Sequence, residues 1–134
     1  MWRFGKTTPK EVWDEPIAGP IGDIAAAERI RNICRSAADS AEQVAGSAGG
    51  PDARQKSDQA KRQRESERYE RAARAAMEIA MKISDDLMRD SAVAQIVDLC
   101  AKANDMKTAR ILFRAIQAET IRTDVTNAHP ALRL

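Results

Sequence analysis

The sequence has few aromatic residues, a single pair of cysteines and no long hydrophobic run, and each shortage excludes a class of protein. Aromatic residues make up 4% of the 134 positions, whereas alanine is abundant. This composition disfavours a β-sheet, which needs β-branched and aromatic side chains, and favours helices packed through small residues. No apolar run approaches the roughly 20 residues that a membrane-spanning helix requires.

Residues that carry catalytic chemistry are equally scarce. His129, the only histidine, precedes a proline near the C-terminus, and no nucleophilic side chain is placed beside it. The glycine-rich stretch GSAGGP (46–51) follows no predicted strand, which makes it a linker and not a phosphate-binding loop. No Cys and His spacing suits zinc. The sequence therefore predicts a non-enzymatic protein without a cofactor or a metal.

The two cysteines, Cys34 and Cys100, lie far apart in segments that read as helices. One pair is too few for a disulfide framework, so we interpret them as reduced, buried thiols, with a structural disulfide or a redox pair as the alternative. The charges nearly balance, with 22 basic and 20 acidic residues, and indicate neither a nucleic acid nor a membrane as partner. The N-terminus resembles neither a secretory signal nor a typical organellar presequence.

Residues 1–22 predict an extended, proline-rich arm, because prolines at 9, 16 and 20 prevent a helix from forming. This arm holds both tryptophans and one of the two phenylalanines: Trp2, Phe4 and Trp13. Large aromatic side chains on an extended segment either bury themselves in a partner or fold back over their own domain. We favour the first alternative, in which the arm anchors the chain to another subunit.

The remainder predicts an all-α fold of about four helices arranged as helical hairpins. Residues 23–46 form the first helix, with Asp23 as its N-cap, and residues 47–68 combine a flexible joint with a basic helical segment. Residues 69–128 form a helical domain, in which one helix reaches Leu87 and the next begins at Asp90 or Ser91. Residues 129–134 are an irregular tail. Within the domain, Asn104-Asp105 predicts a tight turn, since Asn tolerates a left-handed conformation and Asp caps helices.

The basic segment at 54–74 has two interpretations. It is either a solvated helix crossed by ion pairs at i,i+4 spacing, which we favour, or a surface that contacts RNA phosphates. The candidate contact residues are Lys61, Arg62, Arg64, Arg68 and Arg71. Tyr69 is the only aromatic residue among them, so bases would have no stacking platform.

From Asp90 to Asp124 the chain resembles a pentatricopeptide repeat, and fits the related tetratricopeptide repeat less well. The similar features are Ile96-Val97, the turn DLCAKAND (98–105), Ala109, the LF pair at 112–113, Ile116 and the closing IRTD (121–124). The resemblance implies two antiparallel helices packed through Ile96, Ala109, Leu112, Phe113 and Ile116.

Members of this family bind single-stranded RNA in mitochondria and chloroplasts, and read bases through the fifth and last residues of each repeat. Those positions are Ala94 and Asp124 here. A methyl group offers no hydrogen bond to a base, so the resemblance implies a packing scaffold and not a sequence reader.

We therefore expect a structural subunit of a large assembly. The resemblance favours an organellar ribosome or a related ribonucleoprotein, mitochondrial rather than chloroplast, with other subunits as partners and RNA contacted only through its backbone. The alternatives are a peripheral subunit of a membrane energy-transducing complex, an independent RNA-binding adaptor, and a bacterial or phage helical bundle that resembles the repeat by convergence.

Overall fold

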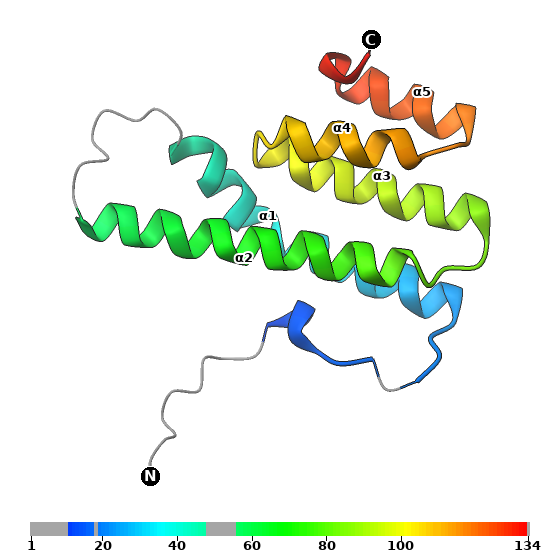
Figure 1. Ribbon diagram of the computed structural model, residues 1–134, viewed down its shortest axis with the longest axis horizontal. Helices are drawn as coiled ribbons and strands as arrows, with labels where there is room; N and C mark the ends of the chain where they lie inside the picture. Colours follow the sequence, from blue (N-terminus) through cyan, green and yellow to red (C-terminus); the bar gives the residue numbers. More distant parts are fainter. Residues whose placement is uncertain (1–10, 18, 48–55, 134) are drawn as a thin grey trace.

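The computed structural model describes residues 11–17, 19–47 and 56–133. In chain order the elements are a 3-10 turn η2 (Val12–Asp14), the helices α1 (Asp23–Ser47), α2 (Lys56–Ala80), α3 (Asp86–Lys102), α4 (Met106–Ala115) and α5 (Glu119–Ala128), and a second 3-10 turn η3 (Pro130–Leu132) (Figure 1). The described residues contain no strand. The all-α prediction is confirmed, with one more helix than expected.

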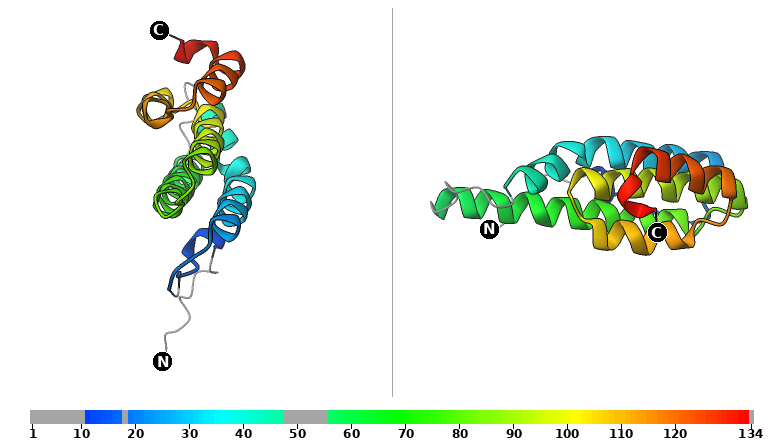
Figure 2. Two further views of the ribbon diagram at one scale, coloured as in Figure 1. Left: turned by 90° about the vertical axis from the view of Figure 1, so that its right-hand side faces the viewer. Right: turned by 90° about the horizontal axis from the view of Figure 1, so that it is seen from above.

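The helices form two antiparallel hairpins and a fifth helix that follows them. α1 pairs with α2, and α3 pairs with α4; α3 also packs on α1 and, over a smaller area, on α2. α5 lies against α3 and the short turn η3. Seen along the helix axes, the two hairpins and α5 are stacked on one another (Figure 2). The basic residues 56–68, predicted as a helical segment after the joint, form the first half of α2.

Small side chains let the helices of the first hairpin approach closely. Six alanines are fully buried: Ala26, Ala37 and Ala41 of α1, and Ala72, Ala76 and Ala80 of α2. In the second hairpin, α3 supplies the larger side chains of the core, including Val93, Ile96 and Val97. These are the apolar faces that the three- and four-residue spacing predicted.

The turn between α3 and α4 has the predicted chemistry. Asn104 adopts a positive φ of 59°, and the Asp105 carboxylate accepts a hydrogen bond from the backbone N–H of Thr108 at 3.3 Å, which caps α4. The Tyr69 hydroxyl also donates to Asp105, at 2.7 Å, and so ties α2 to this turn. Partial burial opposes the ionisation of Asp105, but the hydrogen bonds from Tyr69 and Thr108 prevail and lower its pKa.

The boundary between α2 and α3 differs from the prediction. α2 ends at Ala80 instead of reaching Leu87, whose side chain is exposed. Asp23 is the first residue of α1 and not its N-cap, because its carboxylate accepts hydrogen bonds from the Ser84 N–H and hydroxyl, both at 2.9 Å, and from the Asp85 N–H at 3.0 Å. These hydrogen bonds lower the pKa of Asp23 and fix the turn between α2 and α3 against the start of α1.

Helix α3 begins earlier than predicted, and its cap is Asp85, which accepts from the Met88 N–H at 2.8 Å. Asp90 therefore lies inside α3, where it is 5% exposed. Its carboxylate accepts hydrogen bonds from the N–H groups of Gln117, at 3.1 Å, and Ala118, at 2.9 Å. Asp90 thus holds the link between α4 and α5 against α3.

The C-terminal residues are more ordered than the predicted tail. Within 129–134, residues 130–132 form η3, and Leu132 is buried. His129 contacts the Asp98 carboxylate of α3, with 2.6 Å between Nε2 and Oδ1. This contact and the burial of Leu132 hold the end of the chain on the second hairpin.

Ala109 is fully buried where α4 packs on α3. Replacing it with Leu should overpack this contact and lower the free energy of unfolding by roughly 1–3 kcal/mol. Ala115→Leu is the matched control, since residue 115 is on the same helix but exposed. Urea denaturation followed by circular dichroism measures both variants, and equal stabilities would contradict the packing described here.

Candidate functional site

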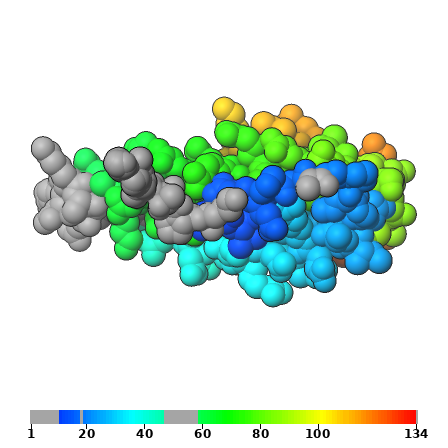
Figure 3. Space-filling view, turned by 90° about the horizontal axis from the view of Figure 1, so that it is seen from below, coloured from blue at the N-terminus to red at the C-terminus, as the bar shows by residue number. Residues whose placement is uncertain are grey.

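The described part of the arm, residues 11–17 and 19–22, packs on the domain through one of the three predicted anchors. Trp13 is 6% exposed and belongs to the core, and Ile17 and Ile21 pack against the same core. Figure 3 shows this segment lying on the face made by α1 and α2. Trp13 is therefore buried against its own domain, which is the second of the two alternatives. Trp2 and Phe4 lie outside the described residues.

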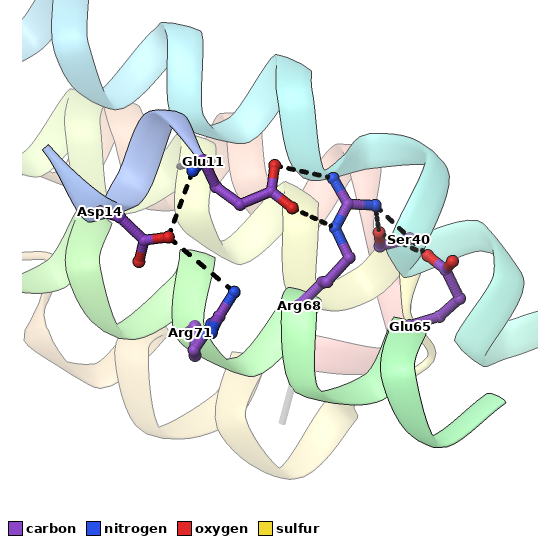
Figure 4. Close-up of polar contacts among 6 residues, drawn as sticks. All are labelled: Glu11, Asp14, Ser40, Glu65, Arg68 and Arg71. Atoms are coloured by element: carbon purple, nitrogen blue, oxygen red, sulfur yellow. Dashed lines mark hydrogen bonds and ion pairs between the residues drawn. The ribbon is translucent and has the colours of Figure 1, made fainter. Parts of the chain in front are cut away.

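Arg68 holds this segment in place (Figure 4). Its Nε donates to Glu11 Oε2 at 2.9 Å and its Nη2 to Glu11 Oε1 at 3.3 Å, and its guanidinium lies 5.2 Å from the centre of the Trp13 ring. Its Nη1 donates to Ser40 Oγ at 2.7 Å. Bidentate pairing with a carboxylate and stacking on an aromatic ring both suit arginine. This network occupies the guanidinium and removes Arg68 from the candidate RNA-binding residues.

The other basic candidates on α2 are not gathered into one site. Arg71 is 4.0 Å from the Asp14 carboxylate, with half of its side chain exposed, so this pair contributes little to stability. Lys61 and Arg64 are exposed, whereas Arg62 is half-buried.

The positions taken from the repeat resemblance are of two kinds, buried packing residues and more exposed base-reading positions. Ile96, Ala109, Phe113 and Ile116 are buried and Leu112 packs against the core, as predicted. Ala94 is half-buried on α3 and Asp124 is exposed on α5. The packing residues thus serve the fold. That Ala94 and Asp124 do not read bases stays a prediction.

A cleft of about 400 Å³ lies between α4, α5 and η3, where no site was predicted. Its lining includes four arginines and one acidic residue: Arg110, Arg114, Arg122, Arg133 and Glu119. α4 carries the first two on one face, because their spacing is four residues. That spacing, with no acidic residue on α4 to pair with either, is the sequence signal that was missed.

Two of these arginines are held by hydrogen bonds to neighbouring residues. Arg122 donates to the carbonyl oxygens of Phe113, at 3.3 Å, and Ile116, at 2.9 Å, and stacks 4.3 Å above the Phe113 ring. Arg133 donates to Asn127 Oδ1 at 3.2 Å. Within the described part of the chain, neither Arg110 nor Arg114 has a hydrogen bond or an ion pair.

The cysteines do not form a reactive site. Burial is the main cause that raises the pKa of Cys34, to about 12, and that of Cys100, to about 11. Both side chains are therefore protonated thiols near neutral pH and poor nucleophiles. Among residues 11–17, 19–47 and 56–133, no cluster of His, Cys, Asp and Glu could hold a metal ion. None of the helices described is long and apolar enough to span a bilayer.

Comparison of the chain with protein-family models, with curated proteins and with solved structures finds no match. The resemblance of residues 90–124 to a pentatricopeptide repeat stays a prediction.

Proposed function

We propose that this chain is a non-enzymatic structural subunit that docks into a larger assembly through the end of the molecule where α1 begins. One observation carries the proposal: three large apolar side chains at this end are more than half exposed. They are Ile24 (77%), Met81 (69%) and Leu87 (57%). We call them the apolar end.

The hydrogen bonds of Asp23 make the apolar end a rigid platform. They join the first turn of α1 to residues 84 and 85, and so fix the backbone that carries Ile24 relative to the backbone that carries Leu87. Leu87 also lines a groove of about 290 Å³ between α1 and α3. A preformed apolar surface loses little conformational entropy on binding, which favours a protein partner that inserts apolar side chains.

Burial would stabilise such a complex substantially. Each large apolar side chain contributes roughly 1.5–3 kcal/mol when it passes from water into an apolar contact. Three of them at one end suffice as the centre of an interface, since a few residues usually carry most of the binding energy.

The assembly that we propose is a ribonucleoprotein, with a mitochondrial ribosome as the specific case. The repeat resemblance of residues 90–124 supports it, as does the stacking of helical hairpins, which serves as packing scaffold in many assemblies. A peripheral subunit of a membrane energy-transducing complex is the competing case, because its docking would use the same apolar end.

The test is co-sedimentation of the full-length, tagged chain in extracts of its native cells. We expect the wild-type chain to migrate with a large particle, and the variant Ile24→Lys/Leu87→Lys to be released from it with an unchanged melting temperature. Ile111→Lys, at a side chain on α4 that is 55% exposed, is the matched control and should stay bound. Nuclease treatment should release the wild type from a ribonucleoprotein but not from a membrane complex. Migration of the wild type as a free small protein would contradict the proposal.

A further inference from the structure

The cleft between α4, α5 and η3 concentrates positive charge in a chain that is nearly neutral. Four arginines line it against Glu119 alone, whereas the formal net charge of the whole chain is +2. Like charges that converge on one cleft repel one another and destabilise the compact state. A bound anion would remove this repulsion.

The arginines of the cleft are hydrogen-bond donors of two kinds: some have no partner, and one is already held in place. Arg110 and Arg114 make no hydrogen bond or ion pair within the described part of the chain, so their guanidinium groups can take a ligand without breaking a contact. Arg122 is already fixed by two backbone carbonyls and by the Phe113 ring. A positioned guanidinium loses little entropy when it binds.

The shape of the cleft selects among anions. Guanidinium groups pair bidentately with phosphate oxygens, and several of them match an anion with several negative charges. A nucleic-acid backbone spreads its charges and is followed by an extended groove of cations. Here the cations converge on about 400 Å³, which is the size of a small-molecule site.

We propose that this arginine cleft binds a diphosphate group, either as free pyrophosphate or as part of a nucleoside diphosphate. Arg110 and Arg114 grip the phosphate oxygens from α4, and Arg122 faces them from α5. This site is separate from the apolar end, and the proposal does not depend on the assembly proposed above.

The test is calorimetric titration of the full-length chain with pyrophosphate and with a nucleoside diphosphate. The variant Arg110→Gln/Arg114→Gln should bind both probes more weakly, by about tenfold for each lost charge-assisted contact. The control Lys61→Gln/Arg64→Gln removes the same charge from an exposed part of α2 and should bind like the wild type. Equal affinity for the two probes assigns recognition to the diphosphate alone, and tighter binding of the nucleotide adds its sugar or base; either result supports the proposal.

Three results would overturn it. The first is that the wild type shows no saturable binding of either probe. The second is that the control variant loses as much affinity as the cleft variant. In the third, a single-stranded oligouridine binds in an Arg110- and Arg114-dependent way while pyrophosphate fails to compete, which makes the cleft a nucleic-acid surface. Thermal melts accompany each titration, and we expect the cleft variant to melt at the wild-type temperature or slightly above it, because neither arginine has a partner to lose and the charge repulsion in the cleft is reduced.

Discussion

Replacing Trp13 with alanine is expected to lower the free energy of unfolding by about 3 kcal/mol, at the lower end of the range for truncating a buried aromatic side chain. The variant loses both the packing of the indole on the core and its contact with the Arg68 guanidinium. Urea denaturation monitored by circular dichroism measures the change.

Two variants of the same segment serve as controls. Val12→Ala removes a side chain that is 39% exposed and should change the stability by less than about 0.5 kcal/mol. Trp13→Phe keeps an aromatic ring, and the indole Nε1 has no acceptor among the described residues, so this variant should lose less than Trp13→Ala. If Trp13→Ala were as stable as Val12→Ala, the tryptophan would be free to anchor a partner, as the sequence suggested.

Asp90→Ala should lower the free energy of unfolding by about 2–3 kcal/mol, because a buried carboxylate that accepts two backbone hydrogen bonds is removed. The N–H groups of Gln117 and Ala118 would lose their acceptor at the start of α5. We expect hydrogen exchange to accelerate first in α5, which contacts the rest of the fold over a small area.

Asp124→Ala is the control for this experiment, since Asp124 is exposed on α5 itself. It should leave both the stability and the hydrogen exchange of α5 near wild-type values. Uniform acceleration of exchange in all helices of the Asp90→Ala variant would contradict a role limited to the link between α4 and α5.

Features that depend on neighbours in the sequence could be predicted. The turn at Asn104-Asp105 follows from the preferences of two adjacent residues, and the buried faces of α1 and α3 follow from their apolar spacing. The all-α fold follows from composition in the same way.

Features that depend on distant partners could not be predicted. Arg68 was taken for an exposed cation because its carboxylate partner, Glu11, is 57 residues away. Asp90 was predicted as a cap of its own helix, but its carboxylate accepts a hydrogen bond from the N–H of Ala118, 28 residues later in the chain. α5 was missed because its sequence is polar and only Val125 is buried, so its apolar spacing is too weak to read.

The arginine cleft also depends on residues that are distant in the sequence. Arg110 and Arg114 could be placed on one face of a helix, but Arg122 and Arg133 join them only when α5 and η3 fold back beside α4. The apolar end has a similar origin, since the hydrogen bonds of Asp23 to Ser84 and Asp85 bring the start of α1, with Ile24, to the same end of the molecule as Leu87.

Docking through the apolar end is tested most directly by photo-crosslinking in native cells, with a photoreactive amino acid at position 24 of the full-length chain. The proposed function predicts that position 24 crosslinks to one protein subunit of a large particle, and that position 111, where the side chain is 55% exposed on α4, does not. Crosslinks from position 24 that are absent, or that match those from position 111 in kind and yield, would contradict it.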